Sequence, residues 1–188
     1  MRADLPAFTQ IETARLRVRR FAEADLPAFL AYRNDPEVAR FQSWDSTSEE
    51  QAHDFLSTMY DEEPGRPGGG FQFAVALREG DALIGDVYMR LLDYDDRQGE
   101  LGYTLARPWH GRGYAAEAVG AVIGYAFATL GMHRMTAIVD QENAPSIRLL
   151  ERLGMRREGA SIQSFFNKGT YRDELQYAIL SSEWANRR

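Results

Sequence analysis

The chain has 188 residues, of which 44% are hydrophobic and 27% charged, a composition typical of globular proteins that excludes a disordered or collagen-like chain. It contains no cysteine, which excludes disulfides, thiolate metal sites and a cysteine nucleophile. The net charge of −6 disfavours general nucleic-acid binding, because affinity for phosphate comes largely from Lys and Arg.

The first third of the chain predicts one strand followed by two helices. Residues 15–21 alternate with period two, as expected of a half-buried strand. Apolar residues recur at helical spacing over 23–33, and the Asn-Asp-Pro sequence at 34–36 predicts the end of this helix. Overlapping capping boxes in 46–51 predict the second helix. The glycine- and proline-rich segment 63–70 predicts a flexible loop after it.

The rest of the chain predicts an antiparallel meander and then alternating helices and strands. The meander has three strand-like runs: 71–78, 83–92 and 100–107. The elements that follow are a long helix over 114–130, a strand over 135–140, a short helix over 145–153, and a hairpin of 155–166 with 171–180. Such elements pack best as an α/β (α+β) fold, a mixed sheet of about seven strands with about four helices on its faces.

The turn between the third meander strand and the long helix is the segment expected to carry chemistry. It runs from Pro108 to Gly113 and contains Gly111. Glycines allow backbone N–H groups to approach a ligand closely, and a helix N-terminus adds a partial charge of roughly +0.5. Strand, glycine turn and helix together predict a cradle for a pyrophosphate. The same glycines would also serve turn geometry alone.

The stretch 110–115 (HGRGYA) resembles the acetyl-CoA motif Q/R-x-x-G-x-G/A of the GNAT acetyltransferases, with His110 in the place of the usual Gln or Arg. The resemblance runs from about residue 15 to residue 184. Further motifs resemble the branch that acetylates ribosomal-protein N-termini, the RimJ/RimL type: 100–105, Trp109, 143–146, 153–155 and 167–173.

The resemblance implies one acetyltransferase domain over 1–188, with its core at about 15–184, and a mostly antiparallel GNAT sheet splayed between the fourth and fifth strands. The pantetheine arm of acetyl-CoA would lie in that gap, and helix-terminal amides would hold the pyrophosphate. Asn143 is expected near the thioester, although a plain turn role before a helix is the alternative. The implied cofactor-binding residues are Leu105, Arg107, His110, Gly111, Arg112, Gly113, Tyr114, Ala115, Ala116 and Asn143.

Acetyl transfer needs a neutral amine, a stabilised oxyanion and a stabilised thiolate. Glu100 matches a family position that often supplies the base, although a solvent-facing strand carboxylate is an equal alternative. Many relatives place a tyrosine acid where this chain has Leu150. Ser146, in the first turn of the short helix, is the expected replacement. Its alternative role is to satisfy a helix amide. Substrate-facing candidates are 41–44, Tyr88 and 165–171.

The predicted function is acetyl transfer from acetyl-CoA to an amine of a protein N-terminus or small molecule, by direct attack on the thioester. One alternative is a non-catalytic acyl-CoA-binding regulatory or interaction module, suggested by the missing tyrosine. Another is a structural domain without CoA affinity. The resemblance leaves a homodimer as an open expectation.

Metal and membrane roles find no support in the sequence. The three histidines lack the spacing of metal ligands, so we predict no metal site. No apolar run approaches the ~18–20 residues that span a bilayer. We therefore predict no membrane contact and a cytoplasmic protein.

Overall fold

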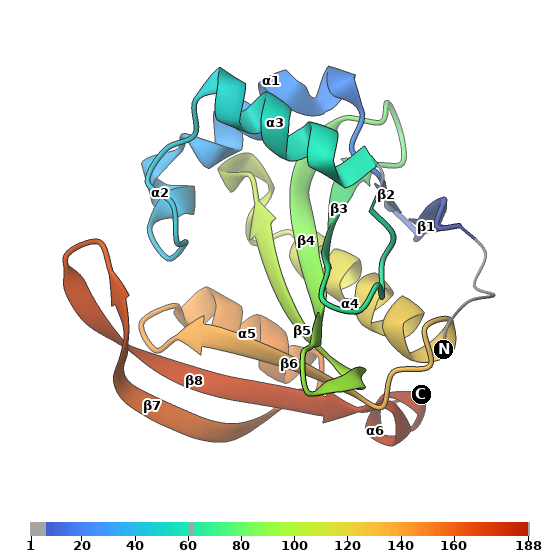
Figure 1. Cartoon of the computed structure of the whole chain (residues 1–188), viewed down its shortest axis with the longest axis vertical. Helices are drawn as coiled ribbons and strands as arrows, with labels where there is room; N and C mark the ends of the chain where they lie inside the picture. Colours follow the sequence, from blue (N-terminus) through green and yellow to red (C-terminus); the bar gives the residue numbers. More distant parts are fainter. Residues whose placement is uncertain (1–6, 61, 188) are drawn as a thin grey trace.

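The computed structural model describes residues 7–60 and 62–187, so both limits of the predicted domain, 1 and 188, lie outside the described residues. In this part of the chain, eight strands form one sheet in the order β1-β2-β3-β4-β5-β6-β8-β7 (Figure 1). The strands are β1 (Gln10–Glu12), β2 (Leu16–Arg19), β3 (Gly70–Leu77), β4 (Leu83–Leu92), β5 (Asp95–Leu105), β6 (Arg134–Asp140), β7 (Arg156–Asn167) and β8 (Thr170–Leu180).

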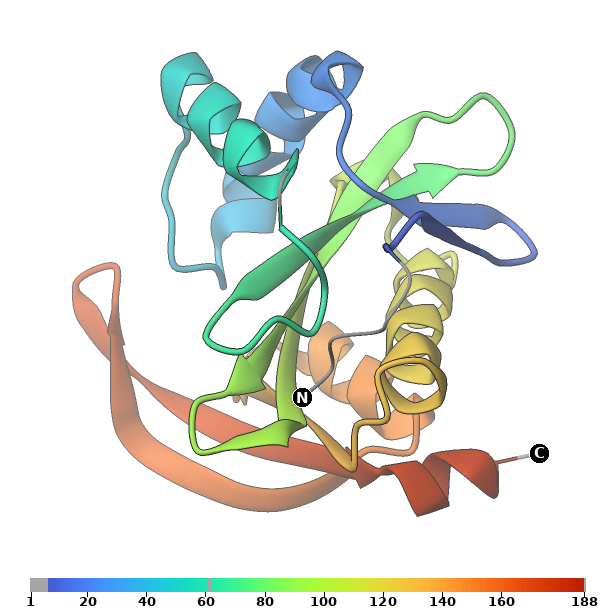
Figure 2. The ribbon, with the colours of Figure 1, turned by 45° about the vertical axis from the view of Figure 1, so that its right-hand side comes forward.

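Helices cover both faces of the sheet. The helices are α1 (Leu26–Arg33), α2 (Pro36–Ala39), α3 (Glu49–Tyr60), α4 (Tyr114–Ala128), α5 (Ala144–Arg152) and α6 (Ser181–Ala185). Figure 2 shows α1 and α3 on one side of the sheet and α4 and α5 on the other. The mixed, mostly antiparallel α/β fold class is therefore confirmed. The sequence did not predict β1, α2 and α6, which have three, four and five residues and are too short to show a period.

Alternation along the strands divides the core into two parts. Val87 and Leu101 point to the α4 and α5 side, where they join a large cluster with Val122 of α4. On the other side, Ala74 of β3 joins a smaller cluster with Phe29 of α1. Neighbours along a strand point to opposite faces. The two faces of the central strands therefore pack into separate hydrophobic clusters.

The sheet parts between β5 and β6. These two strands run parallel and pair only over Gln98–Glu100 and Arg134–Thr136. Beyond this point β5 continues to pair with β4 as far as Leu105, while β6 continues to pair with β8 as far as Asp140. We call the resulting gap, between residues 101–105 and 137–140, the splay. The fourth and fifth strands predicted from the sequence, 100–107 and 135–140, correspond to β5 and β6. The position of the gap therefore confirms the predicted splay.

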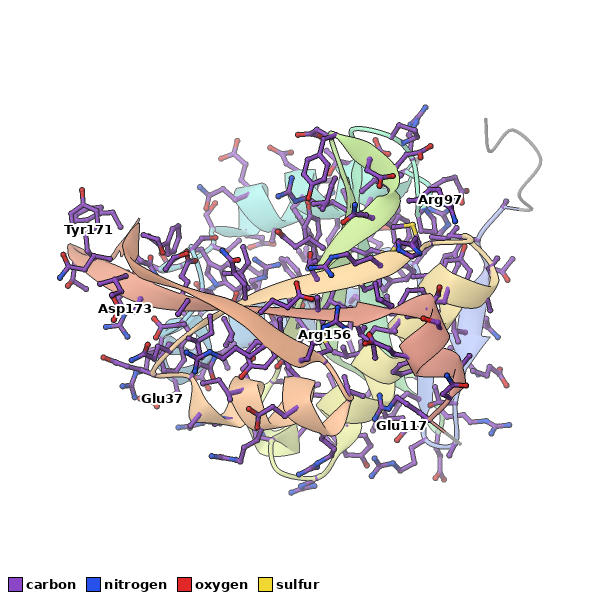
Figure 3. The ribbon with its side chains drawn as sticks, turned by 90° about the horizontal axis from the view of Figure 1, so that it is seen from below. Glu37, Arg97, Glu117, Arg156, Tyr171 and Asp173 are labelled. Atoms are coloured by element: carbon purple, nitrogen blue, oxygen red, sulfur yellow. The ribbon has the colours of Figure 1, made fainter. Side chains whose placement is uncertain are left out.

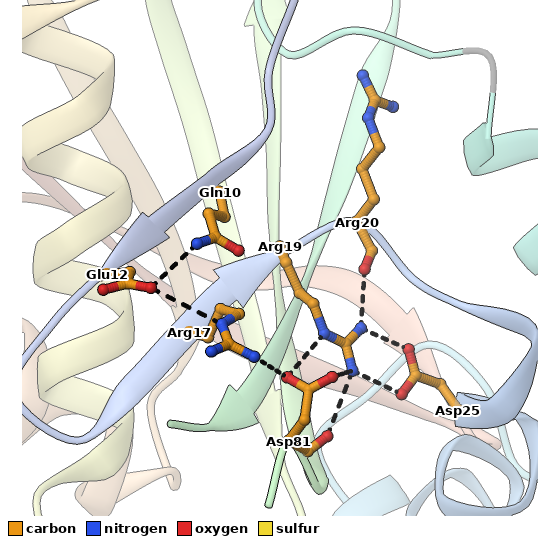
Figure 4. Close-up of polar contacts among 7 residues, drawn as sticks. All are labelled: Gln10, Glu12, Arg17, Arg19, Arg20, Asp25 and Asp81. Carbon is orange, nitrogen blue, oxygen red and sulfur yellow. Dashed lines mark hydrogen bonds and ion pairs between the residues drawn. The ribbon is translucent and has the colours of Figure 1, made fainter. Parts of the chain in front are cut away.

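An ion network anchors β2 to the layer of α1 and α3 (Figure 4). The guanidinium of Arg19 donates to both carboxylate oxygens of Asp25, at 2.7 and 2.9 Å. It also donates to Asp81 in the turn between β3 and β4, at 3.3 Å. The Arg19 and Asp25 side chains are only 13% and 6% exposed, and Asp25 also accepts the N–H of Ala22. This buried pair fixes the start of the first helical segment.

Replacing Arg19 by alanine is expected to lower the free energy of unfolding by about 3 kcal/mol, because the buried Asp25 carboxylate loses its partner. Urea denaturation measures this loss. The control is Arg66→Ala, which removes an exposed pair with Glu62 and should cost less than about 0.5 kcal/mol. Equal losses in the two variants would contradict the assignment.

Candidate active site

The edge of β5 presents its backbone polar groups to the splay. Where the strands still pair, the Gly99 carbonyl faces β6 and accepts the Thr136 hydroxyl at 3.0 Å. The pairing of β5 with β4 is regular from Gly99 to Leu105, so alternate residues direct their N–H and C=O groups the same way. The main-chain groups of Leu101, Tyr103 and Leu105 therefore face the splay.

Two side chains already reach this edge. His110 places Nε2 at 2.6 Å from the Leu105 carbonyl oxygen, and Gln42 donates to the Tyr103 carbonyl at 3.4 Å. The His110 ring thus lies at the strand edge rather than over the glycine turn. Arg107 follows the end of β5 in a short 3-10 turn, and its guanidinium pairs with Asp35 at 3.4 Å.

The glycine turn delivers the N-terminus of α4 beside this edge. Gly111 and Gly113 have φ values of +71° and +81°, which favour glycine, and Gly113 is the N-cap. No side chain caps this helix. The first-turn amides of Tyr114, Ala115 and Ala116 precede the first helical bond, from Glu117 N to Gly113 O. These N–H groups and the helix dipole create a site that favours an anion.

Residues before β2 hold the glycine turn in place. Glu117, labelled on α4 in Figure 3, accepts the Thr13 hydroxyl at 2.6 Å and the N–H and Nε of Arg15 at 2.8 and 2.7 Å. Arg15 also donates to the Arg112 carbonyl at 3.0 Å and lies 4.2 Å from the centre of the Tyr114 ring. Burial raises the pKa of Glu117, but these hydrogen bonds outweigh it and leave the pKa below its usual range.

The start of α5 lies across the splay from β5. Asn143 caps this helix, because its Oδ1 accepts the Ser146 N–H at 3.2 Å. Ser146 places its hydroxyl oxygen 2.6 Å from the Tyr103 hydroxyl. Burial raises the pKa of Tyr103 to about 12, although the Ser146 contact lowers it slightly. Leu150 is 1% exposed in the core. No sequence pattern marks Tyr103, because its partner lies 43 positions later.

Glu100 lies on the opposite face of the same strand. Its carboxylate accepts from Arg90 Nε at 3.3 Å, and Arg90 is its register partner on β4. Tyr88 and Gly102 form the next pair on this face, and a Cβ at Gly102 would meet no atom within 4 Å. Burial raises the pKa of Tyr88, with a further contribution from Glu100 against the lowering effect of Arg90. The open space at Gly102 therefore adjoins the Glu100 carboxylate.

The β7–β8 hairpin closes one side of this face. Figure 1 shows the hairpin curving up toward α2, and Figure 3 shows Tyr171 at its outer end. At its tip, Asn167 donates to the Gln42 carbonyl at 3.2 Å, and Lys168 donates to the carbonyls of Ala39 and Trp44, each at 2.8 Å. The hairpin and the loop between α2 and α3, both expected to face substrate, are thus joined directly.

A buried polar cluster supports the same loop from within. Asp86 is 1% exposed, accepts the Tyr32 hydroxyl and accepts Gln72 Nε2 at 2.5 Å. Burial raises the pKa of Asp86, against the lowering effects of Arg33, Tyr32 and Gln72. The Arg33 guanidinium lies 3.8 Å from Asp86 and 3.8 Å from the centre of the Trp44 ring. The loop is therefore tied to β4 by charge and stacking.

Among the described residues, no cluster of three or more His, Asp or Glu side chains is placed to hold a metal ion. In the same part of the chain, no helix is long and apolar enough to span a bilayer.

The splayed sheet, with a glycine turn at a neighbouring helix N-terminus, is the arrangement that the resemblance implies for an acyltransferase. The model of the acetyltransferase (GNAT) domain matches residues 15–156, and the chain belongs to the GNAT acetyltransferase family. This assignment makes it an N-acetyltransferase, as the sequence predicted.

The relatives agree over nearly the whole chain. An uncharacterized N-acetyltransferase, p20 of Bacillus licheniformis, is 32% identical over 174 residues, which cover 92% of this chain and 97% of p20. A GNAT-family acetyltransferase from Bacillus anthracis superimposes with a TM-score of 0.83 at 29% identity, covering 93% of this chain and 100% of that one. The fold also matches spermidine N-acetyltransferase from Vibrio cholerae in complex with CoA and spermine, with a TM-score of 0.80, 23% identity and coverage of 93% and 100%.

The hydrogen bonds that Glu117 accepts from Thr13 and Arg15 make the stability of the protein depend on pH. Because the folded-state pKa of Glu117 is depressed, its contribution is present above the unfolded-state value of about 4.5 and is lost as the pH falls through the folded-state pKa. Glu117→Gln should therefore be less stable than the wild type at pH 7, by about 1 kcal/mol after solvent screening. This difference should shrink below pH 4.5. Urea titrations across this range measure it, and a constant difference would contradict the prediction.

Proposed function

We propose that this N-acetyltransferase binds acetyl-CoA along the edge of β5 that faces the splay, with the pyrophosphate on the first-turn amides of α4. The observation that carries the proposal is the continuity of these two surfaces, because the polar edge ends at Leu105 and the glycine turn begins a few residues later. An extended pantetheine arm matches a strand edge in its hydrogen-bonding groups. Arg15, held beside the turn by its ion pair with Glu117, places its guanidinium next to Gly113.

The acceptor amine enters from the face that carries Glu100. The space above Gly102 gives it room next to the carboxylate, and Arg90 orients that carboxylate. Glu100 takes the proton of the amine directly or through water. A backbone N–H on the β5 edge, at Leu105, Tyr103 or Leu101, donates to the oxyanion of the attacked thioester.

The leaving sulfur lies on the other face, toward α5. Ser146 sits in the first turn of this nine-residue helix, where the dipole favours negative charge. Its hydroxyl therefore stabilises the thiolate in place of the tyrosine that Leu150 replaces. This arrangement supports direct attack, because the amine and the leaving group would reach the thioester from opposite faces through the splay.

The acceptor class is a protein N-terminus or a small-molecule amine, and the ribosomal-protein (RimJ/RimL-type) branch remains our proposal for the chain. An α-amine has a reference pKa of about 7.7–8.0 against about 10.4 for lysine, so it needs less help from a base. We further propose one cytoplasmic acetyltransferase domain. A homodimer stays a prediction.

Binding of CoA tests the cradle directly. Gly113→Ala should weaken CoA binding at least about tenfold, or about 1.4 kcal/mol, because a side chain at φ +81° shifts the first-turn amides. Isothermal calorimetry measures the affinity. The matched control is Gly80→Ala, in the turn between β3 and β4, where φ is +78°. It carries the same backbone strain and should leave CoA affinity unchanged. Equal affinities for CoA in the two variants would refute the proposed pyrophosphate site.

Turnover tests the two catalytic residues. Glu100→Gln should lower kcat by about 10²–10⁴-fold, and Ser146→Ala by about tenfold, with little change in the KM for acetyl-CoA. Release of free CoA is followed with a panel of peptides and amines. Glu158→Gln is the control, because Glu158 is also a strand carboxylate paired with arginine but lies on β7. CoA binding without turnover on any acceptor would favour the non-catalytic acyl-CoA-binding module.

A further inference from the structure

The contact between Tyr103 and Ser146 is a direct side-chain bond across the splay, from β5 to the first turn of α5. The two hydroxyl oxygens are 2.6 Å apart. Ser146 is held in place because its own N–H is bonded to the Asn143 side chain. Tyr103 packs at the border of the large core cluster. A phenylalanine would fill that site as well, so packing alone does not account for the hydroxyl.

The number of hydroxyl hydrogens in this pair limits the hydrogen bonds that it can donate. Each hydroxyl has one hydrogen to donate, and the bond between the two oxygens uses one of them. The pair therefore keeps one O–H for a third group. A phenol is more acidic than an alcohol and is the better donor, so Tyr103 donates to Ser146. The remaining hydrogen is then the one on Ser146, at the positive end of α5.

We propose that Tyr103 is a positioning residue, which directs the Ser146 hydroxyl toward the sulfur of the departing CoA. The inference rests on the proposed function of the site. As the amine nitrogen bonds to the acetyl carbon, the C–S bond breaks and its electron pair passes to sulfur. Ser146 donates a hydrogen bond to that sulfur, while Tyr103 donates to Ser146. The amine proton leaves through Glu100, and the thiolate takes its proton from solvent.

Tyr103 itself keeps its proton throughout the reaction. Burial holds the Tyr103 pKa at about 12, so the phenol remains a donor over the whole neutral range. A hydrogen-bond donor that keeps its proton, acting here through Ser146, lowers the pKa of the CoA thiol because it stabilises the thiolate. The proposal therefore predicts a measurable property of bound CoA, independent of any acceptor amine.

The experiment measures the thiol pKa of CoA in its complex with the protein. The ultraviolet absorbance of the thiolate is followed against pH, with the desulfo-CoA complex as the blank. In the wild type the thiol pKa should lie at least about one unit below that of free CoA titrated in the same buffer. Tyr103→Phe and Ser146→Ala should each return it by about one unit, a tenfold change in the acid dissociation constant. Ser146→Thr, which keeps a hydroxyl, should retain the wild-type value.

Tyr177→Phe is the matched control. It also removes a tyrosine hydroxyl bonded to α5, but at the far end of the helix, where Tyr177 donates to Glu151 at 3.1 Å. Its complex should keep the wild-type thiol pKa. In turnover, Tyr103→Phe should lower kcat about tenfold at an unchanged KM for acetyl-CoA, since one pKa unit corresponds to a factor of ten.

Each other outcome has a distinct meaning. If CoA binds with the same thiol pKa in the wild type, Tyr103→Phe and Ser146→Ala, the inference fails while acetyl transfer stands. A shift in Ser146→Ala alone also overturns it, because Tyr103 then only ties β5 to α5. Should Tyr103→Phe fail to fold, an unshifted thiol pKa in Ser146→Ala would still refute the proposal. Absence of CoA binding in the wild type would refute the proposed function instead.

Discussion

The parting of β5 and β6 is the constraint on which the rest of this molecule depends. The strands share three residue pairs and then diverge, so one edge in the middle of a continuous sheet has no strand partner. At the joined end, Gly99 allows close packing, because a Cβ there would lie 2.8 Å from Met132 and 3.0 Å from Met135. At the open end, Leu105 leads to the glycine turn. Main-chain groups without a strand partner and a helix N-terminus that favours anions are thereby placed in line.

The splay also connects the two faces of the sheet. Glu100 faces the side of α1 and α3, whereas Tyr103 faces α4 and α5 and contacts Ser146. A thioester in the gap is accessible to a base from one side and to hydroxyl donors from the other. In the proposed reaction, this separation keeps the Glu100 carboxylate away from the developing thiolate, which a second negative charge would destabilise.

Contacts between distant segments hold these groups in register. Glu117 and Arg15 join the start of α4 to the start of β2, while Lys168 joins the hairpin tip to the loop after α2. Beneath that loop, Asp86 and Arg33 provide a buried charged support. Buried polar groups with several partners are costly to rearrange. The proposed acceptor face is therefore built on rigid contacts even though its walls are loops.

The sequence alone determined the features that depend on local pattern. Alternation and helical spacing gave the principal strands and helices, and the glycines at 111 and 113 gave the turn at the start of α4. The family resemblance also implied that Leu150 stands where many relatives have a tyrosine. Only the tertiary structure decided that Tyr103 contacts Ser146, 43 residues later, and that Arg15 contacts Glu117, 102 residues later. Periodicity reports which face a residue occupies, whereas such pairings depend on how the chain folds back between them.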